Sequence, residues 1–121
     1  MRGSCLCGVV TFEVSSAPRN ASACHCGQCR RQSGHVWSSA QVNAGGLTVS
    51  GPVEWYKSSP KAKRGFCSGC GSFLFWKADD EDAISFSLGS IDGPTGLTLG
   101  KHIFTAVKGD YYDISDGVPQ F

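Results

Sequence analysis

The chain has 121 residues and a mass of 12.8 kDa, which is enough for one domain and too little for a cofactor domain beside a separate substrate domain. Hydrophobic residues make up 40%, charged residues 17%, and the formal net charge is +1. This composition excludes a disordered chain and argues against a general nucleic-acid binder, which is expected to be basic. We therefore expect one domain over residues 1–121.

Short β-branched and aromatic segments recur along the chain between glycine- and proline-containing turns, which is typical of an antiparallel, mainly β domain. The predicted strands are 8–14, 36–42, 47–49, 53–57, 72–77, 84–88 and 102–106. Only residues 27–33 predict a helical turn, which is too short to be stable alone. Five aromatic side chains are interpreted as core or sheet-face residues rather than ligand contacts: Trp37, Trp55, Phe73, Phe75 and Trp76.

The sequence contains no apolar stretch near the roughly 20 residues that span a bilayer, and its first residues lack the apolar run of a secretory signal. We therefore expect no membrane partner and a cytoplasmic location. In a reducing compartment, clustered cysteines more often bind metals or act in catalysis than form disulfides.

Seven cysteines, an odd number, lie in three tight groups, so they cannot all pair with one another within one chain. Four of them form two pairs, each followed by a glycine: Cys5-x-Cys7-Gly8 and Cys67-x-x-Cys70-Gly71. A glycine there allows the backbone a positive φ that aims amide hydrogens at the thiolates. The two pairs predict one closed tetrahedral zinc site of structural type, which would clamp the N-terminal segment to a hairpin starting at Gly71.

The other three cysteines, Cys24, Cys26 and Cys29, leave one position of a tetrahedral ion open, as in catalytic zinc sites. His25 is an alternative fourth ligand, although its place between two ligands favours a side chain that points away. His35 and His102 are further candidates. A redox pair of Cys26 and Cys29 is another alternative, weakened by the lack of a βαβ pattern.

Charge indicates what the open site does. Three thiolates and Zn²⁺ sum to −1, so such an ion activates water weakly but can hold a substrate thiol deprotonated. Arg30 and Arg31 follow Cys29 directly and are candidates to offset this charge or to receive a substrate carboxylate, with no more than one expected to act. Lys61, Lys63 and Arg64 either add to a cationic pocket or form a solvated basic loop.

Three segments together resemble the glutathione-dependent formaldehyde-activating family, which includes centromere protein V. They are Gly3-Ser4-Cys5-Leu6-Cys7-Gly8, Cys24-His25-Cys26-x-x-Cys29-Arg30-Arg31-x-x-Gly34 and Phe66-Cys67-x-x-Cys70-Gly71. The resemblance continues in His102-Ile103-Phe104 and in 112–121, so it covers nearly the whole chain. It implies a small zinc-binding β fold, called β-tent or Mss4-like, with a structural zinc on Cys5, Cys7, Cys67 and Cys70. A second, catalytic zinc falls on Cys24, Cys26 and Cys29.

The activity that the resemblance implies is the formation or cleavage of a carbon–sulfur bond. In the founding member, glutathione and formaldehyde condense to S-hydroxymethylglutathione. The expected partners are thus a small-molecule thiol and a small aldehyde, with two zinc ions of which the second is the more labile. An alternative is a non-catalytic zinc module that binds a thiol metabolite or a protein partner. Nucleic-acid binding is disfavoured by the near-zero net charge, and the sequence does not indicate an oligomeric state.

Overall fold

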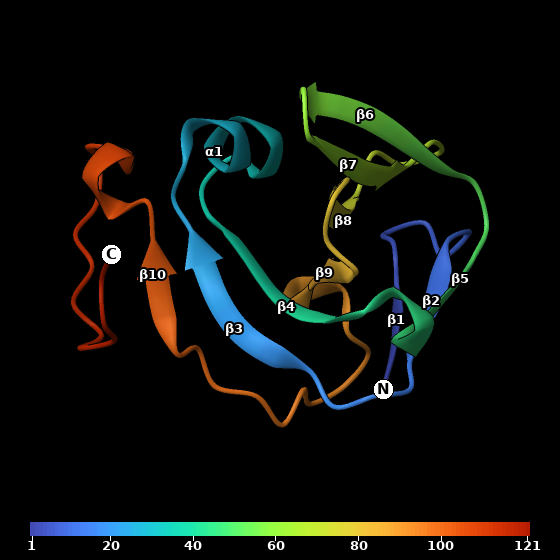
Figure 1. Ribbon diagram of the computed structural model, residues 1–121. Helices are drawn as coiled ribbons and strands as arrows, with labels where there is room; N and C mark the ends of the chain where they lie inside the picture. Colours follow the sequence, from blue (N-terminus) through green and yellow to red (C-terminus); the bar gives the residue numbers. More distant parts are fainter.

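The computed structural model describes residues 1–121 as two β-sheets with one short helix (Figure 1). A small sheet has the strand order β1-β2-β5, and a large sheet has the order β10-β3-β4-β9-β8-β7-β6. The strands are β1 (Arg2–Ser4), β2 (Thr11–Val14), β3 (Arg19–Cys24), β4 (Trp37–Asn43), β5 (Leu47–Ser50), β6 (Val53–Ser59), β7 (Ala62–Cys67), β8 (Phe73–Ala78), β9 (Ala83–Ser87) and β10 (Lys101–Ile103). The helix is α1 (Gly27–Ser33), and 3-10 turns cover Ala44–Gly46, Leu88–Ser90 and Thr105–Val107.

The prediction of a mainly β fold is confirmed, with differences in single strands. All strand pairs are antiparallel except β10 with β3, which run parallel. The strands β1, β3 and β7 were not predicted. The expected strand 102–106 ends at Ile103, because Phe104 adopts a left-handed backbone with φ of 56°. The segment 8–14 begins as a turn and becomes a strand only at Thr11.

The core lies between β2 of the small sheet and β4, β8 and β9 of the large one. The ring of Phe12 meets that of Phe75 edge-on, with ring centroids 5.2 Å apart. Phe12 also lies against the backbone of Gly3, where a Cβ atom would come within 2.2 Å of the ring. Glycine is therefore required at position 3, because any side chain would displace this core aromatic.

The helix α1 connects β3 to β4 and matches the predicted helical turn 27–33. Cys26 caps its first turn by accepting a hydrogen bond from the amide of Cys29, and Gly34 ends it with φ of 85°. In Figure 1 the helix lies across from the hairpin of β6 and β7. No helix of the chain has the length and apolarity needed to cross a membrane.

Candidate metal centre

Three cysteines meet where β3 passes into α1, and we call them the three-cysteine cluster. Cys24 is the last residue of β3, Cys26 caps the helix, and Cys29 lies in its first turn. Their sulfur atoms all lie within 4.8 Å of one another, without a fourth ligand from histidine or carboxylate. Three clustered sulfurs are donors that soft or borderline metals such as zinc prefer, so this cluster could hold a metal ion.

The buried guanidinium of Arg64, from β7, contacts this cluster. Its Nη1 donates to Cys29 Sγ at 3.5 Å and its Nε donates to Gln28 Oε1 at 3.2 Å, while its plane lies over the Phe73 ring. Arg64 is the only lysine, arginine, aspartate or glutamate among the buried residues. It forms no ion pair with a carboxylate. Since a buried charge needs a partner, the partner here is the sulfur cluster.

Hydrogen bonding makes the thiol of Cys29 more acidic than that of Cys24. The Cys24 thiol has the largest effect and Arg64 adds to it, and together they lower the pKa of Cys29 to about 6 against the opposing effect of burial. The pKa of Cys24 is raised, first by its hydrogen bond to Cys29 and then by burial. One thiolate is thus favoured before any metal binds, and it is the one that Arg64 contacts.

Of the basic residues noted in the sequence, the structure separates those near the cluster from those away from it. A cavity lies beside the cysteines, and Arg31 and Arg64 line it, whereas Arg30 does not. The interpretation of a solvated basic loop is wrong for Arg64, which lies buried within β7. Lys63 instead places its Nζ over the Trp55 ring, and Lys61 is exposed.

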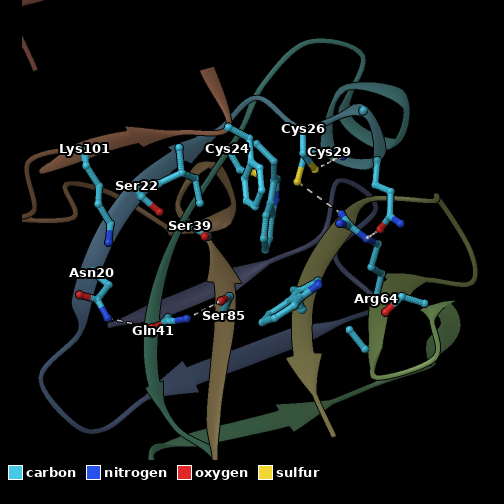
Figure 2. A pocket seen from close by; sticks show the side chains of 18 of the residues that line it. Asn20, Ser22, Cys24, Cys26, Cys29, Ser39, Gln41, Arg64, Ser85 and Lys101 are labelled. Carbon is cyan, nitrogen blue, oxygen red and sulfur yellow. Dashed lines mark hydrogen bonds between the residues drawn. The ribbon is translucent and has the colours of Figure 1, made fainter. Parts of the chain in front are cut away.

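The three-cysteine cluster opens on a cavity of about 810 Å³. Figure 2 shows the cysteines and Arg64 on one side of it and Asn20 and Lys101 on the other. Among its polar lining residues are Ser22, Ser39, Gln41 and Ser85. Trp37 and Trp76 line it as well, and both belong to the small apolar cluster around Cys24 and Cys29.

His25 turns away from the sulfur cluster. Its Nδ1 is hydrogen-bonded to the Tyr112 hydroxyl and its Nε2 lies 2.9 Å from His102 Nδ1. His102 Nε2 in turn lies 2.7 Å from the Asp116 carboxylate. Burial is the main reason that the pKa of His25 is lowered, which favours the neutral ring. Both ring nitrogens are thus engaged elsewhere, and the proposed closure of the site by His25 finds no support in the geometry.

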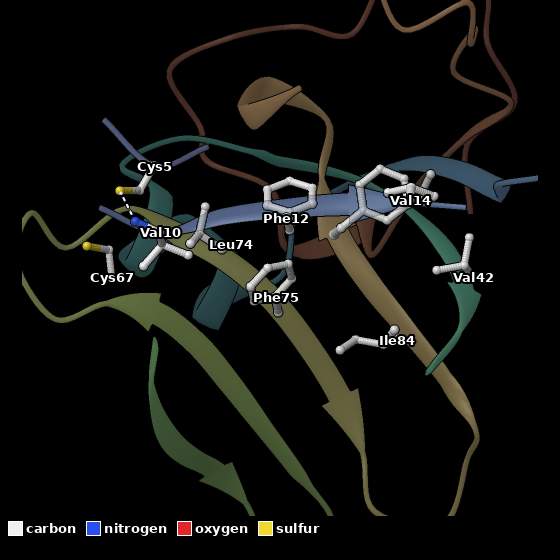
Figure 3. Packing of buried hydrophobic residues seen from close by; sticks show 11 residues of the cluster. Cys5, Val10, Phe12, Val14, Val42, Cys67, Leu74, Phe75 and Ile84 are labelled. Atoms are coloured by element: carbon white, nitrogen blue, oxygen red, sulfur yellow. Dashed lines mark hydrogen bonds between the residues drawn. The ribbon is translucent and has the colours of Figure 1, made fainter. Parts of the chain in front are cut away.

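The remaining four cysteines gather at one end of the hydrophobic core, and we call them the four-cysteine cluster. They are Cys5, Cys7, Cys67 and Cys70, with all four sulfurs within 4.8 Å of one another. Figure 3 shows Cys5 and Cys67 beside the core residues Val10 and Leu74. The cluster could therefore hold a metal ion that joins the N-terminal segment to the connection between β7 and β8.

The backbone around the four-cysteine cluster follows the predicted pattern. Gly8 and Gly71 have φ of 81° and 80°, and backbone amides donate to Cys5 Sγ from Val10 at 3.3 Å and to Cys67 Sγ from Cys70 at 3.5 Å. These bonds favour the thiolates that metal binding requires. Hydrogen bonding, chiefly from the Ser72 hydroxyl, lowers the pKa of Cys70 to about 5.

The chain is similar to known proteins in sequence and in structure. The family model of the glutathione-dependent formaldehyde-activating enzyme matches residues 1–107, which include both cysteine clusters. A Schizosaccharomyces pombe protein described as an uncharacterized lyase is 25% identical over 126 residues, covering 98% of this chain and 88% of its own. The crystal structure of a Rhodobacter sphaeroides protein superposes with a TM-score of 0.63 at 25% identity, covering 79% of this chain and 92% of the other.

Proposed function

Because the chain belongs to the glutathione-dependent formaldehyde-activating enzyme family, we propose that it is a zinc-dependent carbon–sulfur lyase or synthase acting on a small-molecule thiol and a small aldehyde. The observation that carries the proposal is the three-cysteine cluster, which lacks a fourth protein ligand and opens on a cavity of about 810 Å³. The relative described as a lyase supports the reaction class.

The charge and donor set of the cluster favour thiol chemistry. Zinc bound by Cys24, Cys26 and Cys29 would supply a fourth position that holds a substrate sulfur deprotonated at neutral pH. Arg64 offsets the negative charge that four sulfurs would accumulate around it. The four-cysteine cluster, which already has a full set of ligands, has the structural role of holding the fold together.

The proposed reaction joins a thiol and an aldehyde without an oxidant or reductant. The substrate sulfur forms a bond to the carbonyl carbon, the π electrons of the carbonyl pass to its oxygen, and that oxygen takes up a proton. Since the thiol releases one proton on binding, the net reaction is thiol plus aldehyde to hydroxyalkyl thioether. The hydroxyl side chains of Ser22, Ser39 and Ser85 line the cavity and are the candidates to orient the polar parts of the substrates.

The experiment that tests this proposal compares the zinc-loaded protein with Cys26→Ser in a screen of thiols with formaldehyde and other small aldehydes. We expect turnover above the spontaneous rate for the natural chain and a fall of about 100-fold or more toward that rate for Cys26→Ser, as when a reactive group loses its activating metal. Zinc content should fall from about two to about one per chain, because the four-cysteine cluster is intact.

Two results would contradict the proposal. Unchanged turnover in Cys26→Ser would place the chemistry elsewhere. Saturable thiol binding with no rate above the spontaneous reaction would instead identify a non-catalytic module that binds a thiol metabolite.

A further inference from the structure

A second cavity, of about 370 Å³, lies between α1 and the hairpin of β6 and β7. Its lining residues are Gln28, Arg31 and Gln32 from the helix and Tyr56, Ser58 and Arg64 from the strands. Gln28, Arg31 and Arg64 line the larger cavity too, so the two cavities adjoin on either side of these three side chains. Neither cysteine cluster explains this second cavity, because no cysteine lines it.

The lining of the second cavity is cationic and rich in hydrogen-bond donors. It contains two guanidinium groups and no carboxylate. The side chain of Arg31 is exposed and takes part in no hydrogen bond or ion pair within the chain, and Arg64 has no carboxylate partner. A wall with two positive charges and no negative one favours an anion.

The neutral groups of the wall point to the same ligand chemistry. The side-chain oxygens of Gln28 and Gln32 accept hydrogen bonds from Arg64, at 3.2 and 3.5 Å, so each of these acceptors already has a donor within the wall. The hydroxyl of Tyr56 has no partner, and the hydroxyl of Ser58 is buried without one. The groups left free to donate are thus the Arg31 guanidinium and these two hydroxyls, and an oxyanion accepts hydrogen bonds from guanidinium and hydroxyl groups.

We propose that this second cavity is an oxyanion site that takes a carboxylate or phosphate group, with Arg31 as its main contact. The occupant is either the carboxylate of a substrate reaching across from the larger cavity or a free anion. Arg31 is the better placed of the two adjacent arginines because Arg30, its neighbour on the same helix, lines neither cavity. An anion there would lie beside Arg64, the residue that contacts Cys29.

The test uses the full zinc-loaded chain and titrates it with inorganic phosphate and, separately, with propionate, following backbone amides and arginine Nε–H signals by NMR. We expect saturable shifts at Arg31, Arg64 and Tyr56. The variant Arg31→Gln should weaken binding by about tenfold or more, equal to about 1.4 kcal/mol. Arg30→Gln removes the same charge from the same helix and should change the affinity by less than about twofold.

Three outcomes would overturn the site: shifts that do not saturate, equal weakening in Arg30→Gln and Arg31→Gln, or saturable shifts confined to other surfaces. A comparison of 3-mercaptopropionate with propionate identifies the occupant. If 3-mercaptopropionate binds more tightly than propionate and Arg31→Gln removes this difference, the occupant is a substrate carboxylate. If the two acids bind equally, the occupant is a free anion. Either result supports the site. Because binding alone is measured, the site stands or falls independently of the proposed lyase reaction.

Discussion

At the scale of single residues, Arg64 places a positive charge beside the three-cysteine cluster. No carboxylate is paired with its buried guanidinium, so this charge acts on the sulfur atoms. Removing that guanidinium removes a hydrogen bond and a positive charge that lower the pKa of Cys29. In the zinc-free protein, Arg64→Gln should therefore raise the pKa of Cys29 from about 6 by about one pH unit. On acidification, the Cys29 thiolate of this variant is then protonated at a higher pH than that of the natural chain. The measurement is the pH titration of the Cys29 ¹³Cβ signal by NMR.

The matched control for this titration is Lys63→Gln. Lys63 is the neighbouring cation on β7, but its Nζ lies over the Trp55 ring and not at the sulfur cluster. It should leave the pKa of Cys29 where it is. An equal shift in both variants would mean that net charge, and not the contact with Arg64, sets the acidity of Cys29.

Residue identity and spacing were enough to predict the two cysteine clusters and the positive φ at Gly8 and Gly71. The role of Arg64 could not be predicted in the same way. Three basic residues occur within four positions, and which of them faces inward depends on strand register, here Arg64 opposite Tyr56 and Trp76. Nothing in the local sequence determines that register.

At the scale of elements, the parallel strand β10 and the segment after it are held to the β3–α1 junction by a chain of side chains. Tyr112 bonds to His25, His25 to His102, and His102 to Asp116. Tyr112→Phe leaves the buried His25 Nδ1 without its partner, so we expect it to lower the free energy of unfolding by about 1–3 kcal/mol. Urea unfolding measures this change, and hydrogen exchange at the His102 and Phe121 amides should become faster.

Tyr111→Phe is the control for the previous variant. Tyr111 is exposed and its hydroxyl bonds only to the exposed His35, at 2.8 Å, so its loss should cost less than about 0.5 kcal/mol. If Tyr111→Phe destabilised the chain as much as Tyr112→Phe, the His25 contact would not be what holds this segment.

Of the three strands that were not predicted, β3 and β7 have sequences that carry little β signal. The strand β3, with the sequence RNASAC, has no β-branched or aromatic residue, and it is a strand because β4 and β10 pair with it on its two sides. The strand β7, AKRGFC, is rich in charge and contains a glycine, but it lies between β6 and β8. In both, tertiary pairing outweighs local propensity.

At the scale of the whole molecule, the two clusters differ in ligand number and in exposure. These two differences have opposite effects on which cluster should lose its zinc first. Cys7 of the four-cysteine cluster is exposed, whereas Cys24 and Cys29 of the three-cysteine cluster are buried. The three-cysteine cluster still has only three ligands and a cavity through which a chelator can approach. We expect ligand number to matter more than exposure for the rate of zinc loss, since a chelator can bind the ion at an open position.

We therefore expect zinc loss to a strong chelator in two phases, each of about one ion per chain, with the faster phase at least about tenfold the quicker. The fast phase should be absent from Cys26→Ser, which lacks one ligand of the three-cysteine cluster. Release of both ions in one phase would contradict the division into an open and a closed site. A colorimetric zinc indicator with stopped-flow mixing provides the measurement.

The most direct test of the account is ¹¹³Cd NMR of the cadmium-substituted chain before and after addition of a thiol, because the ¹¹³Cd shift reports the number of sulfur ligands. The account predicts two signals at the start, one from four sulfurs and one from three. On addition of glutathione or 3-mercaptopropionate, the three-sulfur signal alone should move into the four-sulfur range. A three-cysteine signal that stays in place at saturating thiol, or that starts in the four-sulfur range, would contradict the claim that this cluster keeps a position for a substrate sulfur.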